Sequence, residues 1–86
     1  MKNLNDYRKE IDEIDEQIVV LLDQRFQKCF EISEYKKEKN ITVEDKKREE
    51  EIKAKILNCK TSEVIKEKLL AVYQEVFKSS KELQRK

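Results

Sequence analysis

The stretch LNDYRKEIDEIDEQIVVLLDQRFQKCFEISEYKKE, residues 4–38, decides the fold of this chain. Within it, Ile11, Ile18 and Ile32 lie on one heptad line, the spacing that places side chains on one face of an α-helix. Asn3 precedes the run as an N-cap. We therefore predict one amphipathic helix over the quoted range, about 50 Å long. A helix of that length has no compact place in a small monomer, so it needs partners along its length.

Two shorter helices are predicted in the rest of the chain. The segment KNITVE, residues 39–44, breaks the heptad pattern, and its Asn40 suits a left-handed helix end. A second helix is predicted over Lys46–Leu57 and a third over Glu63–Gln84. The N-cap candidates are Asp45 for the second helix and Thr61 or Ser62 for the third. The predicted fold class is all-α, with a long, a short and a long helix.

The composition limits the core and excludes several chemistries. The 86 residues are 37% hydrophobic and 45% charged, so we expect a single domain over residues 1–86 that buries enough surface only as an oligomer. The absence of Gly excludes phosphate-binding glycine loops. The absence of His excludes Ser-His and Cys-His catalysis and the usual zinc sites. We expect neither a metal nor a cofactor.

Charge and hydropathy bound the partners and the compartment. The 20 basic and 19 acidic residues give a net charge of +1, which argues against nucleic-acid binding. The longest apolar run, Ile18–Leu22, is too short to cross a membrane, and the N-terminus lacks a signal core. Cys29 and Cys59 have no CxxC spacing. We therefore predict a cytoplasmic protein with reduced thiols.

Basic residues interrupt the apolar stripe of the first helix. Arg25 shares the line of Ile11 and Ile18, where a guanidinium is unfavourable unless it is paired or binds an anion. Lys36 follows on nearly the same face, about 16 Å along the axis, so both side chains can reach one small anion. Arg8 lies about 25 Å from Arg25 along the helix and would serve only the site of another chain. The alternatives are a register-setting Arg25 in a coiled coil and solvated surface residues for the other two.

Two polar groups at helical spacing accompany these basic residues. Asp45, Arg48 and Glu49 share one face at the start of the second helix, where an N-cap and helix-dipole role is the alternative. Ser80 and Gln84 share a face near the end of the third helix, where a frayed polar end is the alternative.

Taken together, these positions resemble the all-helical chorismate mutase family over nearly the whole chain. Each motif is weak alone, and the order and spacing of the five together carry the resemblance. The matching segments are Leu4-x-x-x-Arg8-x-x-Ile11-Asp12-x-x-Asp15, Leu21-Leu22-x-x-Arg25, Glu34-Tyr35-Lys36-Lys37, Val43-Glu44-Asp45-x-x-Arg48-Glu49 and Ser80-x-x-x-Gln84. The resemblance implies an intertwined homodimer of three-helix chains. It also implies an isomerase that converts chorismate to prephenate in aromatic amino acid biosynthesis.

The resemblance also implies roles for the residues that bind the substrate's carboxylates and ether oxygen. Arg25 would bind a carboxylate within its own chain, and Arg8 would reach the site of the partner subunit. Lys36 would contact a carboxylate and the ether oxygen, to which Gln84 would also donate.

Around the substrate's hydroxyl, the resemblance implies a second group of residues. Glu49 would bind the ring hydroxyl, helped by the backbone near Asp45. Arg48 and Ser80 would support hydroxyl and carboxylate binding.

Two alternatives remain open at the level of the sequence. One is an isochorismate pyruvate-lyase on the same fold, which would use a similar set of cations on a related dicarboxylate. The other is a non-catalytic helical dimerisation module, which explains the heptads but not the five polar motifs. The sequence also leaves open a partner enzyme that tunes the activity.

Overall fold

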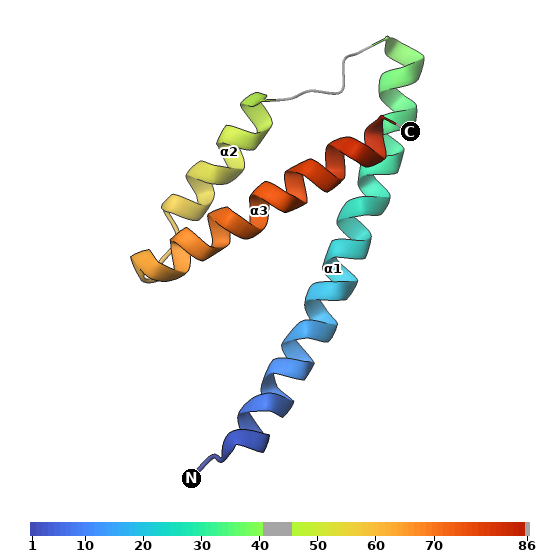
Figure 1. Ribbon diagram of the computed structural model, residues 1–86. Coiled ribbons are helices and arrows are strands. Elements are labelled where there is room, and N and C mark those ends of the chain that lie inside the picture. The colour runs from blue at the N-terminus through green and yellow to red at the C-terminus, as the bar shows by residue number, and fades with distance from the viewer. Residues whose placement is uncertain (41–45, 86) are drawn as a thin grey trace.

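Three helices make up the computed structural model, which describes residues 1–40 and 46–85. They are α1 (Leu4–Lys39), α2 (Lys46–Leu57) and α3 (Glu63–Gln84), in the order shown in Figure 1. Over these ranges there is no strand, which confirms the all-α prediction. The bounds agree with the predicted ones, except that α1 continues one residue further, to Lys39.

Both ends of α1 are closed by asparagine in the predicted way. The Asn3 side chain accepts a hydrogen bond from the Asp6 backbone N–H at 3.0 Å, and the Asp6 carboxylate accepts one from the Asn3 N–H at 3.1 Å. This reciprocal capping box satisfies two backbone donors that the helix leaves open. Asn40 adopts the left-handed conformation, with φ 56° and ψ 37°, and its N–H reaches the carbonyls of the last turn.

A short turn reverses the chain between α2 and α3. The structure selects Ser62 as the N-cap of α3, because its hydroxyl accepts a hydrogen bond from the Ile65 N–H at 3.3 Å. The expectations for the segment 41–44 and for Asp45 as the N-cap of α2 lie outside the described residues.

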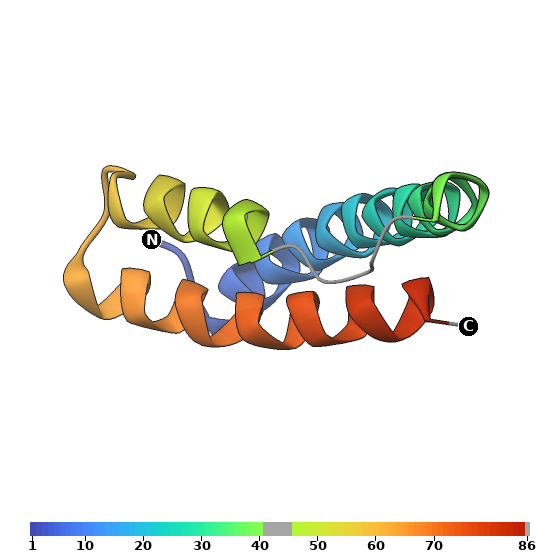
Figure 2. The ribbon, with the colours of Figure 1, turned by 90° about the horizontal axis from the view of Figure 1, so that it is seen from above.

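In space, α3 contacts both of the other helices, and Figure 2 shows α2 and the C-terminal part of α1 on the same side of it. α2 runs back alongside α3 in both Figure 1 and Figure 2, and the C-terminal end of α3 packs against α1. The contact with α1 involves only its C-terminal half, so the N-terminal half projects alone (Figure 1). The result is an elongated chain with a longest dimension of 57 Å.

The core of one chain is small and lies where the helices meet. The apolar residues buried there are Cys29, Ile56, Val76 and Phe77. By contrast, the large apolar side chains in the first half of α1 are exposed, and they include Leu4, Tyr7, Ile11, Ile14, Ile18, Val19, Val20 and Leu21. The predicted stripe therefore exists, but within one chain nothing among the described residues covers its first half.

The structure also describes the two cysteines and the apolar character of the helices. Cys29, which is buried, and Cys59 are both free cysteines in the structure. In the ranges 1–40 and 46–85, no helix combines the length and apolar character that crossing a membrane requires.

Candidate active site

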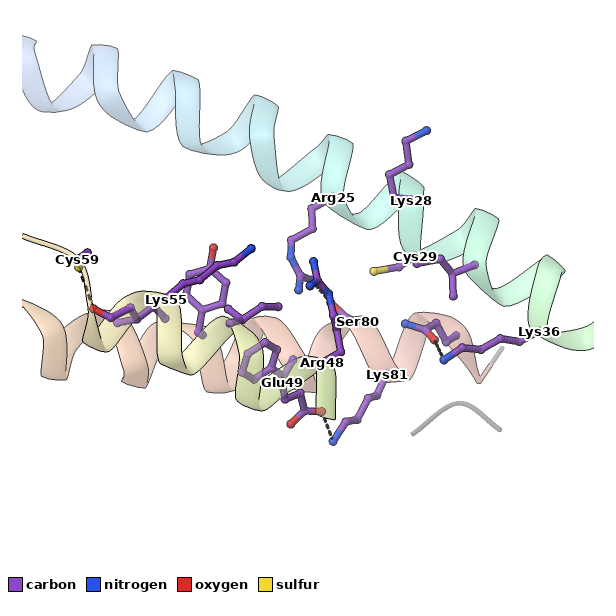
Figure 3. A pocket seen from close by; sticks show the side chains of 16 residues that line it. Arg25, Lys28, Cys29, Lys36, Arg48, Glu49, Lys55, Cys59, Ser80 and Lys81 are labelled. Atoms are coloured by element: carbon purple, nitrogen blue, oxygen red, sulfur yellow. Dashed lines mark hydrogen bonds and ion pairs between the residues drawn. The ribbon is translucent and has the colours of Figure 1, made fainter. Parts of the chain in front are cut away.

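A hollow of about 720 Å³ opens where α1, α2 and α3 approach one another. This size suits a small organic ligand. Figure 3 shows the side chains that surround it. The lining contains both polar and apolar residues, namely Arg25, Lys28, Cys29, Ile32, Lys36, Arg48, Glu49, Ile52, Lys55, Ile56, Cys59, Tyr73, Phe77, Ser80, Lys81 and Gln84. Six of the eight predicted site residues are therefore brought together.

Arg25 is held at this hollow by a hydrogen-bond chain from α3. Its guanidinium donates to the Ser80 hydroxyl at 2.5 Å, and that hydroxyl donates to the Val76 carbonyl at 2.7 Å. Ser80 is buried, so its position is fixed by the packing of α3. The arginine that interrupts the apolar stripe of α1 is thus hydrogen-bonded to another helix, and Figure 3 shows it reaching from α1 toward α3.

Lys36 and Gln84 form the second polar link between α1 and α3. The Lys36 ammonium donates to Gln84 Oε1 at 3.1 Å. The buried Ser33 hydroxyl donates to the Gln84 backbone carbonyl at 3.1 Å, which fixes the last turn of α3. Because its oxygen accepts from Lys36, the Gln84 amide presents its NH₂ group as a donor. An ammonium and an amide donor therefore lie side by side.

The carboxylate of Glu49 lies across the hollow on α2. Its Oε2 pairs with the Lys81 ammonium on α3 at 2.9 Å, and both side chains are partly buried. Arg48, the preceding residue, is exposed and pairs with Glu51 on the same helix at 3.0 Å. Glu49 is thus anchored between helices, whereas Arg48 is held on the surface of α2.

Two predicted site residues are not part of this hollow as described. Arg8 is exposed in the projecting half of α1, far along the helix from Arg25. It does not line the hollow of its own chain, and its role in the site of another chain stays a prediction. Asp45 lies outside the described residues.

Charge and shape define what the hollow can do chemically. Its described lining carries six basic side chains against the single carboxylate of Glu49, and Lys28 points away from the others in Figure 3. Apolar side chains such as Ile32, Ile52 and Phe77 form much of the rest of the wall. The charge and the apolar wall suit a small anionic ligand with an apolar body. Over the described ranges, no group of three or more His, Cys, Asp or Glu residues is placed to hold a metal ion.

Several functional positions escaped the sequence reasoning. Lys81 is the main one, and its signal was weak: it lies one helical turn after Phe77 and one before Gln84. Ser33 and Cys29 also carried a usable signal, since they lie four residues apart between Arg25 and Lys36 on the face that those residues define. The ion pair between Glu49 and Lys81 could not be predicted from the sequence, because it depends on how α2 packs on α3.

Comparison with known families agrees with this geometry. The family model of chorismate mutase type II matches residues 7–85, which is nearly the whole chain. The chain therefore belongs to the chorismate mutase type II family, and the resemblance carried by the five sequence motifs is confirmed.

A curated relative gives the same indication. The chain is 36% identical over 91 aligned residues to a bifunctional chorismate mutase/prephenate dehydratase of Aquifex aeolicus. The alignment covers 100% of this chain and 25% of the relative, so the chain spans about a quarter of that protein's length. The search of solved structures finds no significant match.

Proposed function

We propose that this chain is a chorismate mutase, an isomerase that rearranges chorismate to prephenate. The observation that carries the proposal is the pair of polar links between α1 and α3. They set Arg25 with Ser80, and Lys36 with Gln84, at one hollow rimmed by positive charge. Membership of the chorismate mutase type II family supports the same conclusion.

Binding is the first task that these residues perform. Chorismate carries two carboxylates, and Arg25 and Lys36 supply cationic donors on one face of α1 for them. Arg25 is already fixed by Ser80, so little side-chain entropy is lost when it pairs with a ligand. Glu49 offers a carboxylate oxygen to the ring hydroxyl, and Arg48 lies beside it. These contacts hold the flexible substrate in a compact, reactive shape.

Electrostatic stabilisation is the second task. In the rearrangement, the ether C–O bond breaks while a C–C bond forms in the same molecule, and no proton or electron leaves. Negative charge develops on the ether oxygen as its bond lengthens. Lys36 and the Gln84 amide are donors placed together, so both can act on one oxygen. Each donor of this kind is worth roughly 3–4 kcal/mol in a site shielded from water.

We further propose that residues 1–86 form one domain that acts as an intertwined homodimer, in the cytoplasm. The exposed apolar face of the first half of α1 supports this, because monomeric proteins rarely leave so much contiguous apolar surface in water. In such a dimer, the projecting half of α1 carries Arg8 to the partner's hollow. We also propose that Asp45, which lies outside the described residues, contributes to the same site.

The test is chorismate consumption by the purified protein, without added cofactor or metal, with the product identified. We expect prephenate. In the Lys36→Ala variant, kcat should fall on the order of a hundredfold or more, because a donor to the developing charge is lost. Lys37→Ala is the matched control, since it removes the same charge from the next position of α1 and should keep turnover close to that of the wild type.

Each other outcome has a distinct meaning. If the protein leaves chorismate unchanged but releases pyruvate from isochorismate, the lyase alternative replaces the mutase. If it acts on neither compound, a helical dimerisation module becomes the better account of the chain. If Lys36→Ala raises KM and leaves kcat unchanged, the lysine binds substrate without stabilising the transition state.

A further inference from the structure

The ion pair between Lys81 and Glu49 differs from an ordinary surface pair. The distance between Lys81 Nζ and Glu49 Oε2 is 2.9 Å, and the two side chains are only 27% and 20% exposed. The pair Lys28–Glu31, within α1, is 75% and 64% exposed. Partly buried charges interact more strongly because water screens them less. The pair also joins two helices, so it fixes Glu49 relative to α3 and not only relative to its own helix.

The pair leaves one oxygen of Glu49 for a ligand. Within the described part of the chain, Glu49 is engaged through Oε2 alone. A carboxylate held through one oxygen keeps lone pairs on the other, which can accept a hydrogen bond from a hydroxyl. Since Glu49 and Lys81 both line the hollow, the free Oε1 is available to a ligand bound there.

Without Lys81, the basic residue one turn beyond Glu49 on its own helix is Lys53, which pairs with Glu50 at 3.5 Å in the structure. Lys53 follows Glu49 by four residues, the spacing at which Glu and Lys side chains pair on a helix surface. Both residues line a smaller hollow of about 350 Å³ beside the candidate site. Lys81 also lines this smaller hollow, so the ion pair lies between the two hollows, and a Glu49 side chain released from Lys81 is no longer tied to α3 at their border.

We propose that Lys81 is a positioning residue, which holds Glu49 so that its free oxygen faces the substrate's ring hydroxyl. The inference rests on the proposed mutase function. Lys81 acts through Glu49 and has no direct role in bond breaking. The hydroxyl keeps its contact with Glu49 from the bound substrate to the transition state, so loss of the contact weakens both states alike.

The experiment measures kcat and KM for Lys81→Met, which keeps the length of the side chain and removes its charge. We expect KM to rise about tenfold with little change in kcat. Lys81→Arg preserves the pairing and should rescue KM. Lys78→Met is the matched control, because Lys78 is exposed on the same helix and lines the smaller hollow. It should leave both constants unchanged.

A double-mutant cycle separates positioning from a direct effect. If Lys81 acts through Glu49, adding Lys81→Met to Glu49→Gln should change KM less than about twofold. Independent, multiplying effects would overturn the inference, as would an unchanged KM in Lys81→Met or a failure of Lys81→Arg to rescue it. If the wild type forms prephenate and any of these results is found, the role of Lys81 is wrong but the proposed mutase function stands. A wild type that forms no prephenate overturns the proposed function as well, since Glu49 then has no hydroxyl to meet.

Discussion

The two halves of α1 have the same heptad pattern and opposite surroundings. In the C-terminal half, Cys29 and Ser33 are buried against α3, and Arg25 and Lys36 are hydrogen-bonded to it. In the N-terminal half, the apolar side chains are between 46% and 66% exposed, with Ile18 at the lower limit and Val19 at the upper. One half therefore carries a site, and the other an apolar face with no cover from the described part of its own chain.

The two halves of α1 differ because polar residues interrupt the apolar stripe only in the C-terminal half. The C-terminal half places Arg25, Ser33 and Lys36 among its apolar residues, and α3 supplies the polar partners Ser80 and Gln84. The N-terminal half keeps an apolar line from Leu4 to Ile18, for which α2 and α3 offer no partner. A polar face can be satisfied within one chain or by a ligand, whereas an apolar face of this length requires another apolar face.

The largest expected effect comes from placing a charge on the uncovered face. In the proposed dimer, Ile18→Asp buries a carboxylate without a partner, which destabilises the interface by several kcal/mol. We expect the Ile18→Asp variant to be monomeric and to lose mutase activity, whereas the wild type stays dimeric and active. Analytical ultracentrifugation measures the oligomeric state, and circular dichroism measures the helix content.

A matched control variant tests whether the effect depends on the apolar face or on any change of charge in α1. Glu16 lies about 160° around α1 from Ile18, on the other side of the helix. Glu16→Lys also changes the charge and should leave the dimer intact. A monomeric wild type, or an Ile18→Asp variant that stays dimeric and active, would contradict the assignment of this face to a second copy.

Sharing of the site between chains predicts a recovery of activity on mixing. Arg8→Ala and Arg25→Ala should each lower kcat/KM on the order of a hundredfold, because each removes a cation that binds a carboxylate. After the two variants exchange subunits, each mixed dimer has one intact site and one doubly defective site. We expect about a quarter of the wild-type activity at equal mixing.

The matched control is a mixture in which no intact site can form. In a mixed dimer of Arg25→Ala and Lys36→Ala, one site lacks Arg25 and the other lacks Lys36, because in the proposal both residues act within their own chain. That mixture should stay inactive. Recovery there, or no recovery with Arg8→Ala, would show that Arg8 does not cross to the partner.

A smaller effect is expected at the end of α3. Gln84→Glu replaces an amide donor by a carboxyl group whose ordinary pKa is about 4.3. Only the protonated carboxyl can donate to the ether oxygen, so kcat/KM should rise by at least about tenfold as the pH falls from 8 to 5. The wild type, with a neutral amide, should show no such rise in the same assay. Equal activity of the variant at both pH values would remove Gln84 from the role of donor.

Much of the local structure was predictable because it depends on neighbours in the sequence. The caps Asn3 and Asn40 and the helix bounds follow from short-range hydrogen bonds and from the period of the apolar residues. Helix spacing predicted that Arg25 and Lys36 share a face of α1, whereas their clustering with Ser80 and Gln84 was predictable only through the family resemblance. The α1–α3 packing then determined that Arg25 meets Ser80 and that Lys36 meets Gln84.

The sequence by itself determined three helices, their ends, a polar interruption of one apolar stripe and the family to which the chain belongs. Only the tertiary structure decided which polar residues pair across helices. It joined Glu49 to Lys81, which are 32 positions apart, and it left the first half of α1 without cover from residues 1–40 and 46–85 of its own chain. The reason is physical: capping and periodicity act over a few residues, whereas these pairings depend on how α3 packs against α1 and α2.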